Sequence, residues 1–352
     1  MSNPERLRIL ENTGELPPWW RWGPYVSERS WGTVREDYSA NGDAWRFLPH
    51  DLARSKAYRW GEDGLAGICD RYQLLVFSLA LWNGNDAILK ERAFGLDAWE
   101  GNLGEDVKEY YFYLDNTPTH SYMRYLYKYP HAAFPYRELI EENQRRAGQG
   151  AEYELLDTGI FEENRYFDVE VEYAKATPDD LCIRITTTNR GPEAAPLHII
   201  PQLCFRNTWA WSEPPGAEPF IQLRDKQHPA EPICLIAKQS RAGLLKGLLF
   251  PYQLPDYYLY AINGCSPLFT DNETNTQRVY GTAAADSPRY TKDAFHRFLT
   301  MGEACVNPTN QGTKAGLDYI FEIPAGESVQ IYLRLTPEKS AQPFADISAI
   351  FA

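Results

Sequence analysis

The stretch FDVEVEY, residues 167–173, sets the expectation for the fold. Its odd-numbered positions are apolar or aromatic and its even-numbered positions are acidic, which is the period of a strand with one buried and one solvated face. After the turn sequence PDD (178–180), residues 181–189 predict a second strand, and after NRGP (189–192), residues 197–205 predict a third. The chain around this stretch therefore indicates consecutive strands joined by short turns.

The same pattern recurs on both sides of this region. Residues 316–323 and the alternating residues 329–335 are separated by PAGE (324–327), and we expect these two strands to pair through that turn. Upstream, the apolar run LLVFSLALW (74–82) ends at an Asn-Gly pair, which predicts a buried strand entering a tight turn. Residues 88–94 predict either the returning strand or a short helix.

An aromatic stretch, GEDVKEYYFYLDNTPTHSYMRYLYKYP (104–130), carries nine rings among acids and bases, eight from Phe and Tyr and one from the imidazole of His120. The turn signal DNTP between two β-favouring runs predicts a strand, a turn and a second strand. Rings beside carboxylates suit sugar recognition, because a pyranose offers an apolar C–H face and a rim of hydroxyls. The alternative is that these tyrosines fill the space between core and surface.

The N-terminal part is less regular. Residues 4–10 form a short amphipathic piece, and the Pro-Trp-rich segment GELPPWWRWGPY (14–25) predicts an extended strap on the main body, because its prolines oppose a helix. Residues 25–64 are dense in charges and rings without a strand or helix period, which indicates a solvated loop or a surface that another module or ligand covers. Residues 137–146 favour a surface helix or an ordered loop.

Strands of this length with so few helices favour antiparallel sheets stacked face to face, so we predict a large all-β sandwich with a few short helices. We divide the chain into a strap and polar loop segment packed on the sandwich (1–64), the sandwich itself (65–340) and the start of a linker helix (341–352). Apolar residues of that last segment recur at helical spacings up to Ala352. This pattern predicts the N-terminal part of a longer protein, and the alternative is a short C-terminal helix docked on the sandwich.

Composition narrows the class of function. The 352 residues carry 48 acids against 35 bases, a formal charge of −13 that disfavours nucleic-acid and membrane-surface partners. No window is apolar enough for a membrane span, and we expect a cytoplasmic protein. The six cysteines are far apart and mostly flanked by apolar residues, so we expect buried free thiols. We expect no metal and no cofactor, since turn capping explains the acidic loop DNETN (271–275) better than calcium binding does.

Several long motifs resemble the N-terminal β-sandwich region of bacterial and fungal glucosidase-like proteins related to glycoside hydrolase family 63, the mannosyl-oligosaccharide glucosidase-like group. The segments that carry the resemblance span nearly the whole chain: 22–64, 79–136, RNTW (206–209), FTDNETN (269–275), KDAFH (292–296) and GTKA (312–315). The resemblance implies a galactose-mutarotase-like β-supersandwich that packs on a C-terminal (α/α) toroid of the same full-length protein. It also implies hydrolysis of an α-glucoside with inversion, with both catalytic carboxyl groups in the toroid.

No pair of acids in this chain matches the catalytic positions of the resembling family, so we assign no catalytic residue. We expect this chain to be a non-catalytic module that supports the toroid and shapes the rim of the sugar pocket. The candidate residues for contact with carbohydrate or with the toroid are Trp31, Arg35, Glu36, Asp37, Arg59, Trp60, Glu62, Asp63, Glu105, Asp106, Lys108, Asp115, Thr119 and His120. Three roles stay open for them: interdomain or scaffold ion pairs, direct sugar contact, or solvated loops.

Two other functions remain. One is a stand-alone enzyme similar to an aldose mutarotase, in which His120 with Glu105 or Glu109 would serve as acid and base on a free sugar. The other is a carbohydrate-binding module, whose exposed rings would stack on sugars without any chemistry.

Overall fold

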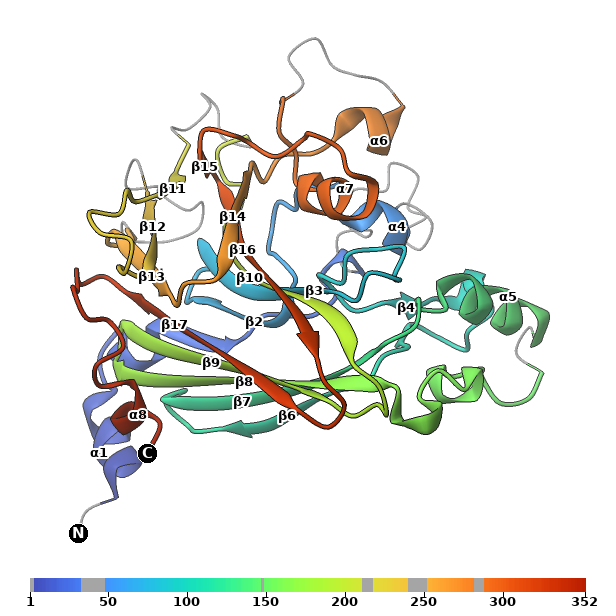
Figure 1. The fold of residues 1–352 in the computed structure, drawn as a ribbon, viewed down its shortest axis with the longest axis horizontal. Coiled ribbons are helices and arrows are strands. Elements are labelled where there is room, and N and C mark those ends of the chain that lie inside the picture. Colours follow the sequence, from blue (N-terminus) through green and yellow to red (C-terminus); the bar gives the residue numbers. More distant parts are fainter. Residues whose placement is uncertain (1–2, 33–47, 147–148, 211–217, 240–251, 282–287) are drawn as a thin grey trace.

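The protein is an antiparallel β-sandwich (Figure 1), which confirms the predicted fold class. The computed structural model describes residues 3–32, 48–146, 149–210, 218–239, 252–281 and 288–352. All strand pairs among these residues are antiparallel and form two large sheets and one small one. Within the described part of the chain, no helix has the length and apolar character needed to cross a membrane.

The smaller of the two large sheets has six strands. Their spatial order is β1 (Trp22–Tyr25), β2 (Leu65–Asp70), β3 (Leu75–Trp82), β10 (Ala195–Phe205), β16 (Lys314–Ile323) and β14 (Cys265–Thr270). The N-terminal strap thus contributes an edge strand of this sheet rather than only lying on its surface.

The larger sheet has nine strands. Their order is β15 (Gln311–Gly312), β11 (Phe220–Leu223), β12 (Ile233–Lys238), β13 (Tyr257–Ala261), β17 (Ser328–Thr336), β9 (Asp180–Asn189), β8 (Tyr166–Thr177), β7 (Tyr122–Pro130) and β6 (Tyr111–Asn116). A separate two-stranded pair is formed by β4 (Gly95–Leu96) and β5 (Asp106–Val107).

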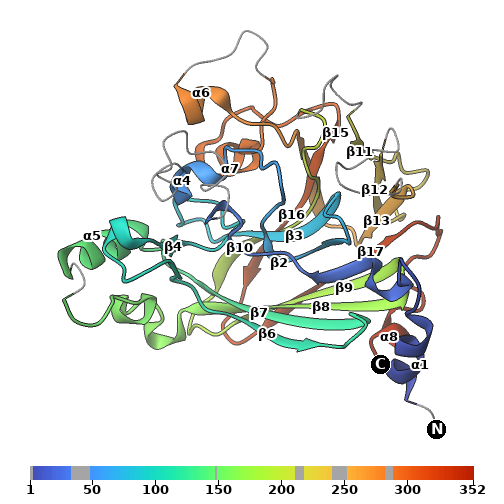
Figure 2. The same ribbon diagram turned by 180° about the vertical axis from the view of Figure 1, so that it is seen from behind.

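The helices are short. They are α1 (Pro4–Glu11), α4 (His50–Ala53), α5 (Tyr136–Arg146), α6 (Thr276–Tyr280), α7 (Ala294–Met301) and α8 (Ile347–Ile350), with 3-10 turns η1 (Pro18–Arg21), η2 (Ala98–Glu100), η3 (Leu155–Thr158) and η4 (Glu162–Asn164). Figures 1 and 2 show α4 and α7 on the face of the six-stranded sheet that points away from the nine-stranded sheet.

One hydrophobic core joins the two large sheets. Alternate residues point into it, for example Phe77 and Leu79 of β3 opposite Val169 and Val171 of β8, all at most 2% exposed. The period-2 pattern of residues 167–173 is therefore the core-facing pattern of β8, which confirms that expectation. The strands predicted at 74–82, 181–189 and 197–205 are confirmed as β3, β9 and β10.

The predicted pairing of residues 316–323 with 329–335 is wrong, although both strands exist. Strand β16 pairs with β10 and β14 in the six-stranded sheet, whereas β17 pairs with β9 and β13 in the nine-stranded sheet. Asn189 anchors the crossover, because its side-chain amide donates to the carbonyl oxygen of Ile323 at 2.8 Å and its backbone N–H donates to that of Glu327 at 3.0 Å. The turn at 324–327 therefore changes sheets instead of closing a hairpin.

Two further expectations need correction. The Pro-Trp-rich strap was expected to be extended, but its residues 18–21 form one 3-10 turn. This turn is possible because proline is tolerated at the first position of a helix. Residues 88–94 form neither a regular strand nor a helix, and only Lys90 bridges to Leu81. The hairpin expected within 104–130 and the helix expected at 137–146 are confirmed as β6–β7 and α5.

The C-terminal residues make one helical turn, α8, which packs near the nine-stranded sheet. Ile347 is buried, and the guanidinium of Arg184 on β9 lies 4.5 Å from the ring centroid of Phe351. Arg334 of β17 donates to the carboxylate of Asp346 at 2.7 Å. These contacts dock the last turn on the sandwich. All six cysteines are free, and five of them are buried.

Candidate functional site

The candidate functional site is a cluster of six buried charges, which we call the ion-pair cluster. Its members are at most 7% exposed, and they are the acids Glu62, Asp63 and Glu91 and the bases Arg92, Lys292 and Lys314. Two of the acids, Glu62 and Asp63, belong to the residues predicted from the sequence. The four others were missed as site residues, although KDAFH and GTKA, which contain the two lysines, were among the motifs that carry the family resemblance.

The cluster lies on the outer face of the six-stranded sheet, opposite the hydrophobic core. Lys314 begins β16, and its neighbour on β10, Cys204, faces the same side. Glu62 comes from the segment that leads into β2, and Lys292 comes from the segment before α7. Loops and a helix from three parts of the sequence therefore close over the sheet at this point, and the six charges lie between the layers.

Every acid of the cluster pairs with a base. Lys292 Nζ lies 3.0 Å from Glu62, and Lys314 Nζ lies 2.5 Å from Glu91. Arg92 Nε lies 3.1 Å from Asp63, and its Nη1 lies 3.5 Å from Glu91. Buried charges cost several kcal/mol each unless they are paired, so this one-to-one matching is what makes the cluster tolerable inside the protein.

Neutral groups complete the cluster. The side-chain amide of Gln202 donates to Glu91 at 3.1 Å, and that of Asn272 donates to Glu62 at 2.6 Å. The hydroxyl of Tyr58 donates to the carboxylate of Asp63 at 2.9 Å. Burial alone would raise the pKa of Glu91, but Lys314 and Arg92 outweigh burial and bring it to about 2. Glu91 is therefore ionised at neutral pH.

A small cavity of about 20 Å³ lies among these side chains. Such a volume has room for about one water molecule and none for a sugar ring. The carboxylate oxygen Oε2 of Glu91 lines this region without a hydrogen-bond partner. The cluster therefore connects the six-stranded sheet to the loops that cover it and leaves no space for a ligand larger than water.

Near the cluster, two more of the predicted residues have different surroundings. Trp31 is 1% exposed and its indole N–H donates to the carbonyl oxygen of Ala93 at 3.0 Å, so its ring offers no stacking face to a ligand in this structure. Trp60 is 63% exposed, with the guanidinium of Arg59 4.7 Å from its ring centroid. The predicted residues Arg35, Glu36 and Asp37 lie outside the described residues.

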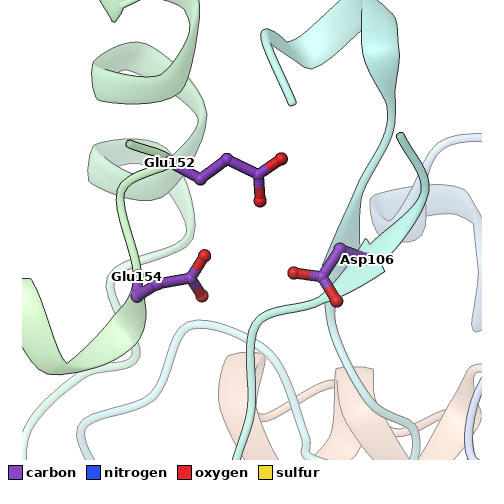
Figure 3. Close-up of side chains that lie close together, drawn as sticks. All are labelled: Asp106, Glu152 and Glu154. Carbon is purple, nitrogen blue, oxygen red and sulfur yellow. The ribbon is translucent and has the colours of Figure 1, made fainter. Parts of the chain in front are cut away.

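Lys108 is the centre of a second charged group, whose three acids are drawn in Figure 3. Its Nζ lies 3.0 Å from Asp106, 2.9 Å from Glu152 and 2.6 Å from Glu154. In the described chain, these three acids come close enough to hold a metal ion, with ligand atoms within 4.8 Å, and their carboxylates face one another. The lysine ammonium already serves as their shared cation, so the group is a salt-bridge network around one buried lysine.

The remaining predicted residues lie along the β6–β7 hairpin and beside it. Glu105 pairs with Arg29, and Asp115 is exposed on β6. Thr119 at the hairpin turn donates through its backbone N–H and its hydroxyl to Glu5 of α1, at 2.8 and 2.7 Å. These contacts tie the hairpin turn to the N-terminal helix.

His120, in the same turn, is near Asn116, with 2.8 Å between its Nδ1 and the amide oxygen. Burial lowers the pKa of His120 to about 4, and Lys175 adds to this effect. Glu109 lies at the opposite end of β6, where it accepts a hydrogen bond from Lys90 at 2.6 Å. His120 and Glu109 are therefore separated by the length of a strand, and the structure does not bring them together as an acid–base pair.

The aromatic stretch 104–130 divides between core and surface. Tyr125, Tyr127 and Tyr129 of β7 are at most 1% exposed and belong to the core, as the simpler interpretation predicted. Strand β6 lies at the edge of the nine-stranded sheet. Its residues Phe112, Tyr113 and Leu114 are 42 to 48% exposed. Among the Phe and Tyr rings of this stretch, only those of Phe112 and Tyr113 are exposed, and together with Leu114 they form an outer strip on β6.

One pair of acids was not predicted as a site. Asp271 and Glu273 follow β14, and burial, with a smaller contribution from the nearby Glu218, raises the pKa of both. Glu273 accepts a hydrogen bond from the indole of Trp209 at 2.6 Å. Asn275 of the same loop caps α6, so turn capping accounts for part of this loop, as expected. The sequence motifs FTDNETN, which contains both acids, and RNTW, which contains Trp209, could have indicated this site.

The comparisons with known proteins add one sequence relative. The uncharacterized protein YMR196W of Saccharomyces cerevisiae is 44% identical to this chain over 358 aligned residues. The alignment covers 95% of the chain and 32% of the yeast protein, so the chain spans about a third of the length of this relative. No protein-family model matches the chain.

Two solved structures are similar to the chain only in outline. A galactose mutarotase related enzyme from Lactobacillus acidophilus is 9% identical, with a TM-score of 0.27, over 81% of this chain and 98% of that one. A putative aldose 1-epimerase from Escherichia coli is 12% identical, with a TM-score of 0.24, over 64% and 67%. A similarity at these TM-scores assigns neither a function nor site residues.

Proposed function

We propose that this chain is the non-catalytic β-sandwich module of a longer glucosidase-like glycoside hydrolase of the family 63 type. The observation that carries the proposal is the pairing of acids with bases in the ion-pair cluster. A glycosidase needs two carboxyl groups about 5 to 10 Å apart with a sugar between them. In the cluster each carboxylate faces a buried base instead, and the cavity there, at about 20 Å³, admits no sugar.

The length of the yeast relative supports the same proposal. The chain aligns with only 32% of that protein, so most of the relative lies outside the aligned region. We assign the catalytic carboxyl groups to such an additional domain, an (α/α) toroid of the same full-length protein. The exposed strip Phe112–Leu114 on the sheet edge is the proposed contact surface, because an unpaired edge strand with apolar side chains favours coverage by a partner.

In this role the ion-pair cluster keeps the loops that cover the six-stranded sheet in one arrangement. Loops that must present a fixed rim to a sugar pocket gain from such anchoring, because binding then costs less ordering. The full-length protein would act on α-glucosides, and we place it in the cytoplasm, in keeping with six free thiols.

The experiment compares hydrolysis by the purified 352-residue chain and by the full-length yeast relative on a panel of α-glucosidic disaccharides. We expect release of glucose by the longer protein and no release above buffer by the chain alone. Turnover by the chain alone would contradict the non-catalytic role, and failure of the longer protein on every α-glucoside would contradict the glucosidase assignment.

A second candidate function is carbohydrate binding by the chain itself, and the exposed Trp60 favours it. Its indole is 63% exposed beside the guanidinium of Arg59, an arrangement in which the ring can stack on a sugar and the cation can bond to hydroxyls. Calorimetry with glucose disaccharides tests this function. Heat that Trp60→Ala abolishes and Trp99→Ala on η2 preserves would support it, and no heat with the unmodified chain would exclude it.

A further inference from the structure

A hollow of about 300 Å³ lies where the N-terminal strap closes one end of the sandwich. Three segments form its walls: Leu16 to Arg21 of the strap, Arg71 in the turn between β2 and β3, and the segment 252–255 that leads into β13. The turn belongs to the six-stranded sheet and β13 to the nine-stranded sheet, so the hollow lies at the mouth between the two layers. Its volume is at the lower end of the range for small-molecule sites.

The walls of the hollow are held in place by specific contacts. The backbone N–H of Arg71 donates to the carbonyl oxygen of Arg21 at 2.7 Å, which joins the turn to the strap. The indole of Trp22 donates to the hydroxyl of Tyr257 at 2.8 Å, which joins the strap to β13. Tyr72 and Tyr252 pack edge to face, with ring centroids 4.4 Å apart. The hollow is therefore a preformed feature of the described residues.

The charge of the hollow opposes that of the whole protein. Two arginines, Arg21 and Arg71, line it, and no acid does among the described residues that form it. Arg21 pairs with Asp179, which is not part of the lining. Arg71 is exposed and has no ion-pair partner in the described part of the chain. Arg71 therefore leaves one uncompensated positive charge in the wall of the hollow, and on a chain with a formal charge of −13 this favours a negatively charged ligand there.

The rest of the lining is mainly apolar. Leu16 is 44% exposed, and Pro17, Leu254 and Pro255 continue the apolar wall beside the ring of Tyr252. A fully hydrated inorganic ion gains nothing from such a wall, whereas an organic group attached to an anion buries its own apolar surface there. Guanidinium groups bind oxyanions with paired N–H donors, which adds directionality to the charge attraction.

We propose that this hollow is a binding site for a small organic oxyanion. The charged group contacts the guanidinium of Arg71, with Arg21 beside it, and the organic part lies on Leu16 and Leu254. The site is independent of the ion-pair cluster and of the proposed role in a glycoside hydrolase, since it shares no residue with either. It assigns this chain a ligand of its own.

Calorimetry with three probes tests the proposal at about 0.1 M salt: phenyl phosphate, inorganic phosphate and benzyl alcohol. We expect phenyl phosphate to bind more tightly than either of the probes that carry only half of its chemistry. Arg71→Met should weaken phenyl phosphate at least tenfold, and Arg71→Lys should weaken it less, because lysine keeps the charge but loses the paired donors. Leu16→Ser should weaken phenyl phosphate but leave inorganic phosphate unchanged.

The matched control is Arg137→Met on α5, where the arginine is 88% exposed and pairs with Glu141. Binding by this variant should equal that of the unmodified chain. No heat with phenyl phosphate, or equal weakening by Arg71→Met and Arg137→Met, would overturn the site. Phenyl phosphate binding that Leu16→Ser leaves unchanged would overturn the role of the apolar wall and with it the organic character of the ligand.

Discussion

The Nζ of Lys314 lies 2.5 Å from Oε1 of Glu91, although 223 positions separate the two residues in the sequence. Lys314 is fixed at the start of β16, whereas Glu91 belongs to a segment that makes a single bridge to the sheet. The ion pair therefore connects a covering loop to the sheet at a point where few backbone hydrogen bonds do so. Both side chains are almost fully buried, which makes the pair sensitive to the loss of either partner.

We expect Glu91→Gln to lower the free energy of unfolding by about 3 to 5 kcal/mol, because it leaves Lys314 and Arg92 buried with one acid fewer. Urea denaturation measures the change. The control is Glu141→Gln, whose partner Arg137 is 88% exposed and which should cost less than about 0.5 kcal/mol. Equal stability of Glu91→Gln and the unmodified chain would show that the pair contributes nothing to stability.

The same carboxylate predicts a dependence on acid pH. Because the pKa of Glu91 is lowered to about 2, its contribution is complete above the unfolded value of 4.5 and is lost as the pH falls from there towards 2. Unfolding curves of the unmodified chain and of Glu91→Gln between pH 2.5 and 6 should therefore converge at the acid end. A constant difference across this range would contradict the lowered pKa.

Lys175 predicts a dependence at higher pH. Its Nζ donates to the carbonyl oxygens of Trp19 and Trp22 at 2.7 and 2.6 Å, and burial lowers its pKa to about 7, against smaller opposing effects of Asp179 and Glu5. Above pH 7 the unfolded chain binds a proton there that the folded chain does not. This group alone should therefore add up to about 1.4 kcal/mol of stability per pH unit from pH 7 towards 10.5.

The measurement is the difference in unfolding free energy between the unmodified chain and Lys175→Met from pH 7 to 9. A difference is needed because buried thiols with raised pKa values act in the opposite direction in both proteins. Lys238→Met, at a lysine whose side chain is 39% exposed, is the control and should leave the slope unchanged. A difference that stays constant with pH would contradict a neutral Lys175.

Lys108 offers a gain-of-binding test. Three carboxylates surround its ammonium, and they raise its pKa to about 12 against the opposing effect of burial. Removing the ammonium in Lys108→Ala leaves three acids with ligand atoms within 4.8 Å, and we expect weak calcium binding, with Kd on the order of 0.1 to 1 mM. Calorimetry with CaCl₂ measures it, and Lys108→Ala/Glu152→Gln should lose it again. Calcium binding by the unmodified chain at this site would contradict the lysine's role.

Gly316 tests how closely α7 packs on the six-stranded sheet. A Cβ atom at this position would lie 3.1 Å from Ile200 Cγ2 and 3.1 Å from Phe295 Cε2. We expect Gly316→Ala to destabilise the protein by about 1 to 3 kcal/mol through overpacking, as measured by thermal or urea unfolding. Gly104→Ala, which meets no atom within 4 Å, should be neutral or slightly stabilising. Similar stability of both variants would show that α7 shifts to make room.

The sequence alone predicted several of the strands and, for residues 167–173, the face that points into the core. The alternation at 167–173 gave β8, the apolar run at 74–82 gave β3, and the turn signal within 104–130 gave the β6–β7 hairpin. These features depend on neighbouring residues, since a strand's period and a turn's backbone are local properties. For the candidate site, the sequence supplied Glu62 and Asp63 but none of their bases.

Only the tertiary structure decided which strands pair and which charges meet. The sequence of 316–335 fits a hairpin, yet β16 and β17 belong to different sheets, because each completes a sheet whose other strands come from distant parts of the chain. The ion pair of Glu91 likewise depends on the arrangement of distant strands, because Lys314 comes close to Glu91 only when β16 lies beside β10. The local sequence pattern determines where a strand forms and which of its faces is buried. Which strands pair depends on burying the apolar faces of all strands at the same time.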